Sequence, residues 1–336
     1  MITVKENFVV KGNKYKFGKT LIIAEAGSNH NQNINYAKKM IDIAASSGCD
    51  AVKFQVFEAD KIIQKKYKGW KILKSLEFYI PWLRILKKYA NKKKLLFGLS
   101  VFDTNFISSL KFNDLDFIKI ASTEIQDLNL IKAAAKLKKP IILSTGGANI
   151  IDISKAFYCV KKFNDNFAFL HCVSAYPAKV NQLNLNMIAT MKNFLGAPIG
   201  YSDHSLSVSI PSIAVAKGAC IIEKHITFDK NAKGPDHAFA LNQDELKIMV
   251  KNIRDAELSF GIPIKQPAIK NERKKLARRI VANKNLNKGD KINKKNIIIL
   301  RADENGILPS DIDKIIGLKI NKKIKVNEVL NWDDFK

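Results

Sequence analysis

Two lysines stand inside runs that otherwise have the composition of buried β-strands. Lys53 lies in Ala-Val-Lys-Phe-Gln, and Lys119 lies in Phe-Ile-Lys-Ile-Ala-Ser. An ammonium group buried without a partner is costly, so a lysine in such a strand indicates a bound anion. The alternative is that each strand exposes one polar residue at its edge. Serines near the ends of similar runs would add hydroxyl donors suited to a phosphate or carboxylate: Ser100, Ser122, Ser144 and Ser202.

Two histidines also end short apolar runs, and neighbouring runs would bring their rings together. These are His204 and His225. Two imidazoles without a nearby thiolate or third histidine are typical of an open metal site, completed by water and substrate oxygens. Ordinary packing is the alternative for any single histidine. Of the other three histidines, His171 lies within a run and is interpreted as structural, while His30 and His237 stay open.

Eight short apolar runs must position these residues. Runs apolar on both faces and joined by amphipathic segments predict a parallel sheet covered on both sides. Eight such units in about 240 residues predict an α/β fold, the (β/α)8 TIM barrel. The expected strands are Leu21–Ala26, Ala51–Phe57, Leu95–Val101, Phe117–Ser122, Pro140–Thr145, Phe167–Ser174, Pro198–Asp203 and Cys220–Ile226. The expected helices are Asn35–Ser47, Phe78–Lys92, Asn105–Phe112, Leu128–Lys138, Ile151–Phe163, Leu185–Asn193, Leu206–Lys217 and Asn242–Phe260.

The carboxyl ends of barrel strands converge on one mouth, where the active sites of such enzymes lie. Each expected strand ends in residues able to bind an anion, a metal or a hydroxyl. In chain order these are Glu25, Lys53, Gln55, Ser100, Phe102, Lys119, Ser122, Glu124, Ser144, Ser174, Tyr176, Ser202, Asp203, His204, Glu223, Lys224 and His225. The rigid turn Gly234-Pro235-Asp236-His237 would present Asp236 toward this mouth, with a surface loop as the alternative.

The pattern differs at both ends of the chain. Residues 1–20 alternate like a small hairpin with its turn at Lys11-Gly12-Asn13, which could cap the bottom of the barrel. After Gly261 the chain loses periodicity and contains two prolines, as linkers do. We expect a barrel domain over residues 1–262, a linker over 263–278 and a small β-rich domain over 279–336. Its expected strands are Arg279–Ala282, Ile297–Arg301 and Lys319–Ile324.

Composition excludes several classes of protein. No apolar run approaches the roughly 18 residues of a membrane span, and the first ten residues lack the apolar core of a signal peptide. We therefore expect a cytoplasmic protein with no membrane partner and with its four cysteines reduced. The net charge of +26 raises the possibility of a nucleic-acid partner. Only six of the 57 basic residues are arginine, however, and the lysines are scattered, so we expect no nucleic acid.

Several motifs together resemble those of bacterial sialic acid (N-acetylneuraminate) synthases, a group that includes legionaminic and pseudaminic acid synthases. The order and spacing match from residue 20 to about 240, and the tail, through Ala282–Asp290 and Leu300-Arg301, resembles their antifreeze-like (SAF) domain. The motifs are Ile23–His30, Val52–Gln55, Lys119–Glu124, Leu143–Gly147, His171–Pro177, Gly200–His204, Glu223–His225 and Gly234–Asp236.

The resemblance implies that phosphoenolpyruvate and an N-acetylated amino sugar are the substrates. Phosphoenolpyruvate would bind Lys53, Ser100, Lys119, Ser122, Ser144 and Ser202. A divalent metal, Mn²⁺ or Mg²⁺, would bind His204 and His225. The sugar would bind Gln55, Phe102, Glu124, Tyr176 and Asp236. Two chains would pair as a homodimer with the SAF domain over the partner's barrel, so that Arg301 reaches the partner's substrate.

Condensation of these substrates fits the residues. A Lewis-acidic metal polarises an aldehyde, and two lysines hold a trianion against it. Carbon 3 of phosphoenolpyruvate would attack, water would add at carbon 2, and phosphate would leave by C–O cleavage. Glu25 is our candidate for stabilising the cationic centre and handling protons. The product would be a nonulosonic, sialic-type acid.

The sequence leaves open which sugar is the acceptor and allows two other functions. Ser174 replaces a common asparagine of the neuraminate enzymes, and Arg301-Ala302-Asp303 replaces their Arg-Pro-Gly, so N-acetylmannosamine and a diacetamido hexose both stay open. One rival is a keto-deoxy sugar-phosphate synthase, which needs a second basic cluster for a phosphorylated aldose. The barrel portion offers only Arg84 and Arg254, both on expected helices. A non-catalytic carbohydrate-binding protein is the other rival.

Overall fold

The computed structural model describes residues 6–111, 114–266 and 276–336. The chain divides into two compact units, residues 1–261 and 262–336, and each is described by itself. Within the described residues, no helix is long and apolar enough to cross a membrane.

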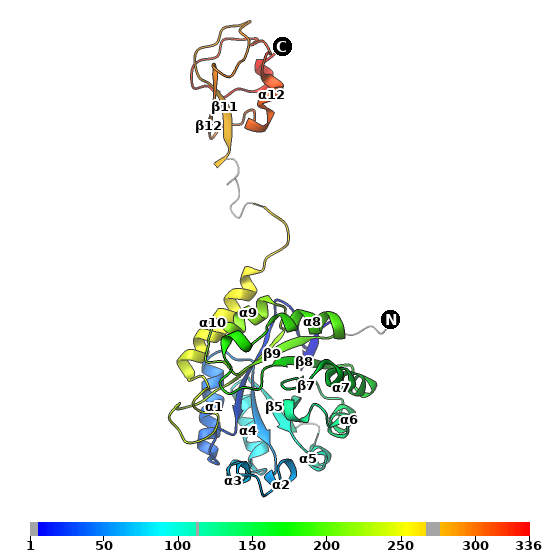
Figure 1. Cartoon of the computed structure of the whole chain (residues 1–336). Coiled ribbons are helices and arrows are strands. Elements are labelled where there is room, and N and C mark those ends of the chain that lie inside the picture. The colour runs from blue at the N-terminus through cyan, green and yellow to red at the C-terminus, as the bar shows by residue number, and fades with distance from the viewer. Residues whose placement is uncertain (1–5, 112–113, 267–275) are drawn as a thin grey trace. The chain divides into compact units, whose positions relative to one another are not determined.

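The first unit is a closed eight-stranded parallel barrel, as predicted (Figure 1). The strands follow one another around the barrel in chain order, and β10 pairs with β3 to close it. Each strand is buried along its whole length or nearly so. The strands are β3 (Leu21–Gly27), β4 (Ala51–Val56), β5 (Leu96–Val101), β6 (Phe117–Ile120), β7 (Ile141–Ser144), β8 (Phe167–Cys172), β9 (Ile199–Asp203) and β10 (Ile221–His225).

Amphipathic helices surround the barrel and cover the outward face of its strands (Figure 1). Asparagine or aspartate caps several of them. Asn149 and Asn242 form capping boxes, which satisfy the free amide groups of a first turn. The helices are α1 (Ile34–Ser46), α2 (Ala59–Ile62), α3 (Gly69–Lys74), α4 (Trp82–Lys92), α5 (Thr104–Ser109), α6 (Leu128–Lys136), α7 (Ile150–Phe163), α8 (Asn186–Leu195), α9 (Ile210–Ala216) and α10 (Gln243–Ser259).

The inward faces of the strands change character from the bottom of the barrel to its mouth. Near their amino ends the strands contribute an apolar cluster that includes Leu21, Ala51, Leu96, Phe117 and Ile221. Successive inward positions lie two residues apart, so the inward side chains nearer the mouth can differ from those at the base. Glu25 follows Ile23 on β3, and Lys53 follows Ala51 on β4. The barrel therefore has an apolar base and a polar mouth.

A short hairpin contributes to that apolar base. Strands β1 (Phe8–Val10) and β2 (Asn13–Tyr15) pair antiparallel, and Phe8, Val10 and Tyr15 belong to the same buried cluster as the strand starts. Asn166 anchors the hairpin, because its side chain accepts from the Val9 amide at 3.0 Å and donates to the Val9 carbonyl at 2.7 Å. The predicted hairpin and its place at the bottom of the barrel agree with the structure.

The second unit has a small core of its own. Its antiparallel strands β11 (Arg278–Ala282) and β12 (Ile297–Arg301) pack with buried isoleucines and leucines, including Ile292, Ile320 and Leu330. The short helix α12 (Ile312–Ile315) adds Ile315. The third strand expected in this unit, Lys319–Ile324, is not formed, because this segment makes only isolated bridges at Lys319, Ile320 and Ile324.

Local chemistry shifted several helix boundaries. The helix expected from Phe78 begins at Trp82, because Pro81 cannot continue a helix backwards and occupies the N-cap. The helix expected from Leu206 begins at Ile210, since the Ser207 hydroxyl accepts from the amides of Ser209 and Ile210 and holds a turn there. Helices α2 and α3, of four and six residues, were missed. The end of the expected helix Asn105–Phe112 lies outside the described residues.

The buried hairpin predicts a large cost for truncating its central ring. Phe8 is fully buried, so Phe8→Ala should lower the free energy of unfolding by about 3–5 kcal/mol. Urea unfolding followed by circular dichroism would measure it. Phe17, which is 47% exposed, supplies the matched control, and Phe17→Ala should cost far less. A small loss in Phe8→Ala, no larger than that for Phe17, whose ring stacks on Phe260, would show that the hairpin does not stabilise the barrel.

Candidate active site

Polar side chains from all eight strands or their carboxyl ends line one cavity of about 240 Å³. All of the residues predicted for phosphoenolpyruvate and for the metal are among them. The lining comprises Glu25, Lys53, Gln55, Ser100, Phe102, Lys119, Ala121, Ser122, Thr123, Ser144, Cys172, Ser174, Tyr176, Ser202, His204, Glu223 and His225. The predicted convergence of these side chains on the barrel mouth therefore agrees with the structure.

Two lysines and two glutamates form a buried charge cluster at the floor of this cavity. Lys53 contacts the Glu25 carboxylate closely, and its Nζ lies 3.7 Å from Glu223 Oε2. Lys119 Nζ lies 3.2 Å from Glu223 Oε1. All four side chains are at most 5% exposed. The ammonium groups are thus compensated in pairs, which reduces the cost of burying them.

The surroundings of Glu25 and Glu223 shift the pKa values of their carboxyl groups in opposite directions. Burial raises the pKa of Glu25 above its ordinary value, and the nearby ammonium of Lys53 opposes that effect only in part. Burial also acts on Glu223, but Lys119 and Lys53 outweigh it and lower its pKa to about 2. Burial lowers the pKa of Lys119. Glu223 is therefore the fixed anion of the cluster, whereas Glu25 is placed to exchange a proton.

Hydroxyl groups surround the two ammonium groups. Ser100 Oγ accepts from Lys53 Nζ at 2.6 Å, and Ser202 Oγ donates to Glu223 Oε1 at 3.0 Å. Ser122 Oγ accepts from the Gly146 amide at 3.0 Å. The Ser144 hydroxyl is buried and has no hydrogen-bond partner among the described residues. A buried hydroxyl without a partner costs free energy, so it favours a ligand that supplies one.

The two predicted histidines lie side by side, with ring centroids 5.4 Å apart. The Val173 carbonyl lies 3.0 Å from His204 Nδ1, which places the proton on Nδ1 and leaves Nε2 with a free lone pair. His225 Nδ1 is buried without a hydrogen-bond partner in the described part of the chain. Burial lowers the pKa of both rings, that of His225 strongly, so both are neutral near pH 7. Neutral, unpartnered imidazole nitrogens are suitable metal ligands.

The residues predicted for the sugar are only partly together. Gln55, Phe102 and Tyr176 line the cavity, and Gln55 Nε2 donates to Glu25 Oε1 at 3.1 Å. Asp236 is not in the lining of the described residues, although its Oδ2 lies 3.8 Å from His225 Nδ1. Glu124 lies half-buried just outside, on the turn that follows β6. Arg301 is exposed at the end of β12 in the second unit.

A glycine permits the close approach of three of these side chains. Gly27 has a positive φ of 52°, which glycine adopts at little cost. A β-carbon there would lie 3.3 Å from Glu25 Oε1 and 3.6 Å from both Asp236 Oδ2 and Gln55 Nε2. The three polar groups therefore converge over this glycine.

Sequence reasoning overlooked some functional residues and included two that lie elsewhere. Glu223 had no assigned role, although it precedes His225 by two residues and so shares its face of the strand. Asp203 and Lys224 were counted at the mouth but occupy the opposite face, where Lys224 Nζ donates to Asp203 Oδ2 at 2.6 Å. Phe239 was not considered, and its ring lies edge-on to both metal-candidate histidines.

The remaining three histidines have structural surroundings. His171 Nε2 lies 2.8 Å from the Leu183 carbonyl, which agrees with its structural interpretation. His237 contacts Thr227 and Asn31. His30 packs among the rings of Phe54, Phe78 and Trp82, and burial lowers its pKa to about 4.

Comparison with known proteins agrees with this geometry. The NeuB family model matches residues 40–265, and the SAF domain model matches residues 277–336. The chain belongs to the NeuB family. Two N,N'-diacetyllegionaminic acid synthases are similar to it. That of Legionella pneumophila is 36% identical over 93% of each chain. That of Campylobacter jejuni is 38% identical over 93% of this chain and 99% of its own.

Solved NeuB-like structures have the same fold. The spore coat polysaccharide biosynthesis protein SpsE of Bacillus subtilis is 35% identical over 98% of this chain and 99% of its own, with a TM-score of 0.70. The N-acetylneuraminic acid synthetase of Leptospira borgpetersenii, solved with citrate, is 34% identical over 81% of this chain and 96% of its own, with a TM-score of 0.76. The match to the Bacillus subtilis protein, at 98% of this chain, extends to both units.

The charge cluster of this NeuB protein predicts strong coupling between Glu223 and Lys119. Glu223→Gln should lower the free energy of unfolding by about 3 kcal/mol, because it leaves buried ammonium groups uncompensated. Adding Lys119→Met should recover part of that loss, with a coupling of at least about 1 kcal/mol in urea unfolding.

An exposed ion pair provides the control for that cycle. Lys251 and Asp255 pair on the surface of α10, so Asp255→Asn should change the stability by no more than about 0.5 kcal/mol. Additive losses for Glu223→Gln and Lys119→Met would show that the two buried charges do not depend on each other.

Proposed function

We propose that this protein condenses phosphoenolpyruvate with an open-chain N-acetylated amino sugar to give a nonulosonic acid and phosphate. The observation that supports this most directly is the convergence of two buried lysines, several serines and a neutral histidine pair in one cavity. The similar legionaminic acid synthases are named for products of this class.

The cavity floor would hold phosphoenolpyruvate. Lys53 and Lys119 provide ammonium groups for its phosphate and carboxylate, and Ser100, Ser122, Ser144 and Ser202 provide hydroxyl donors. Substrate oxygens would replace the carboxylate partners of the lysines in part. The unpartnered Ser144 hydroxyl would gain a hydrogen bond when the anion enters.

A divalent cation, Mn²⁺ or Mg²⁺, would be held by His204 and His225. Their free nitrogens fit such an ion, because imidazole is a common ligand and substrate or water oxygens complete an open site. When bound, the cation would polarise the acceptor's aldehyde. His204 itself is oriented by the Val173 carbonyl, so the ligand nitrogen is directed into the cavity before any ion arrives.

The acceptor would lie against the other side of the cavity. Gln55, Tyr176 and Asp236 offer an amide, a hydroxyl and a carboxyl to its polar groups, with Phe102 and Glu124 at the rim. In a homodimer, Arg301 of the partner subunit would approach the same substrate. The protein would act in the cytoplasm.

The proposed steps balance in atoms and protons. Carbon 3 of phosphoenolpyruvate bonds to the aldehyde carbon as the carbonyl π bond breaks, so the aldehyde oxygen becomes an alkoxide and a cationic centre develops at carbon 2. The carboxylate of Glu25 stabilises that centre, accepts a proton from the water that adds there and passes it to the alkoxide, which becomes a hydroxyl. The tetrahedral intermediate then breaks its bond between carbon 2 and the bridging oxygen. Phosphate leaves with that oxygen and takes the proton of the carbon 2 hydroxyl, and carbon 2 becomes a ketone.

The surroundings of the barrel arginines disfavour a phosphorylated acceptor. Arg84 pairs with Asp114, and Arg254 is bonded to Asp50 and Glu257. Neither arginine lines the cavity among the described residues. A second phosphate would therefore find no arginine among the described residues that line this cavity.

The first prediction of this function concerns metal-dependent phosphate release. Release from phosphoenolpyruvate should require both Mn²⁺ and an N-acetylated aldose, and EDTA or His225→Ala should abolish it. Phosphoenolpyruvate carrying ¹⁸O at its bridging position should give labelled phosphate. Label retained in the organic product would contradict C–O cleavage. Release only with phosphorylated aldoses would favour the keto-deoxy sugar-phosphate synthase instead.

The second prediction concerns Glu25. Glu25→Gln should lower kcat by about 10²–10⁴-fold, because the amide can neither accept a proton nor stabilise a cation. The KM for phosphoenolpyruvate should change little, since Lys53 keeps its contact with Ser100. Near-normal turnover in a folded Glu25→Gln variant would remove Glu25 from the mechanism.

A further inference from the structure

A second cavity, of about 450 Å³, lies at the end of the barrel remote from the mouth. Its lining includes Asp116, which directly precedes β6, and Pro140, which directly precedes β7. It also includes Lys11, in the turn of the hairpin that packs on the apolar base. These positions lie at the amino ends of the strands, whereas the candidate active site lies at their carboxyl ends.

Four lysines from three parts of the chain meet in this cavity, which we call the lysine cavity. Lys11 belongs to the hairpin, Lys87 lies on α4, and Lys138 and Lys139 follow α6. Asp116 is the one acidic residue among the described residues of the lining. Four ammonium groups against one carboxylate leave an excess of three positive charges.

The Asp116 carboxylate is already fully engaged. Lys11 Nζ lies 3.1 Å from Asp116 Oδ1, and Lys87 contacts Asp116 Oδ2 closely. Asp116 Oδ2 also accepts from the Phe97 amide at 2.8 Å. The side chains of Lys87 and Asp116 are 10% and 5% exposed, so little water screens them. The other two lysines of the lining therefore add positive charge that this carboxylate cannot balance.

The lysines of the cavity disfavour one another's charge. Burial lowers the pKa of Lys87, and the charges of Lys11 and Lys139 lower it further, although Asp116 opposes both effects. Burial and the charge of Lys11 likewise lower the pKa of Lys139. A bound anion would stabilise the charged form of each ammonium group.

The lysine-rich composition of the chain does not by itself account for this excess. A cavity of about 340 Å³ near the same hairpin is lined by two lysines, Lys16 and Lys192, and one glutamate, Glu6. The active-site cavity contains two lysines and two glutamates. The lysine cavity thus has a larger excess of positive charge than either of these two.

We propose that the lysine cavity binds a diphosphate-type anion, either free or as part of a larger molecule. One phosphate group carries about 1.5 to 2 negative charges near pH 7, so two linked groups come closer to the excess of three. Ammonium groups from three directions can contact oxygens of both phosphates, and the Asn91 amide adds a further donor. This inference does not rest on the proposed function, because the two cavities share no lining residue.

Calorimetric titration of the full chain with inorganic pyrophosphate tests the proposal. EDTA keeps divalent cations from the ligand, and a constant ionic strength keeps general screening equal. The native protein should bind an equivalent of pyrophosphate that Lys11→Met/Lys139→Met binds at least about tenfold more weakly, because two charge-assisted hydrogen bonds are lost. Lys16→Met/Lys192→Met removes the same charge from the neighbouring cavity and is the matched control, which should bind like the native protein.

A second variant keeps all four lysines. Asn91→Asp places a new carboxylate in the cavity at an exposed position of α4, so the fold should be retained while the affinity for pyrophosphate falls. An unchanged affinity in both Asn91→Asp and the double variant would overturn the proposal. An equal loss in the matched control would also overturn it, because binding would then follow net charge alone.

Adenosine diphosphate distinguishes the two sources of the anion. The lining has no aromatic ring among the described residues, so a nucleobase would find no stacking partner there. We therefore expect similar affinities for pyrophosphate and adenosine diphosphate, both lowered in Asn91→Asp. A tighter affinity for adenosine diphosphate, lowered in the same variant, would identify a nucleotide as the ligand. No binding of either anion to the native protein would overturn the proposal.

Discussion

Burial of two ammonium groups inside a closed barrel is the constraint on which the rest of this structure depends. Lys53 and Lys119 cannot reach bulk water from their strands, so carboxylates must lie beside them. Glu25 and Glu223 meet that requirement from β3 and β10, the pair of strands that closes the barrel. The charge cluster therefore exists only when the barrel is closed, and the fold and the site form together.

That constraint also explains the division of the barrel interior. Charged groups at the mouth need low mobility and little water beneath them, and the apolar base provides both. The hairpin contributes Phe8 and Val10 to this base, although it lies far from the site. Ser100, which accepts from Lys53, and Ser202, which donates to Glu223, complete the cluster from two further strands. The position of the charge cluster at the mouth of the barrel thus depends on the apolar packing at its base.

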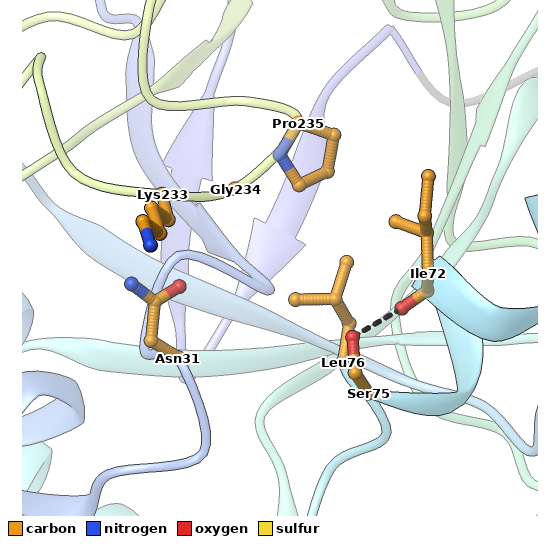
Figure 2. A pocket seen from close by; sticks show the side chains of 7 residues that line it. All are labelled: Asn31, Ile72, Ser75, Leu76, Lys233, Gly234 and Pro235. Atoms are coloured by element: carbon orange, nitrogen blue, oxygen red, sulfur yellow. Dashed lines mark hydrogen bonds between the residues drawn. The ribbon is translucent and has the colours of Figure 1, made fainter.

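The sequence predicted the eight strands and most of the polar residues at their ends, but it did not predict the loops and short helices between them. The eight strands were evident because each is apolar on both faces, and a lysine within such a run has few explanations other than a ligand. Asp203 and Lys224 were misplaced because a shift of one residue changes the face of a strand. Helices α2 and α3 were missed because four to six residues show no clear period. The cavity lined by Asn31, Ile72 and Gly234 (Figure 2) could not be foreseen, since Asn31 and Gly234 lie some 200 positions apart in the chain and meet only through the β10–β3 pairing.

Charge balance gives the proposed function a further physical basis. The two lysines and two glutamates cancel, and the histidines are neutral, so a trianionic substrate would leave the floor of the cavity strongly negative. A divalent cation held by the histidines would offset most of that charge. Burial already raises the pKa of Glu25, whereas Glu223 keeps its charge beside Lys119. Under the proposed function, Glu25 is thus the carboxyl group placed to accept the proton of the attacking water.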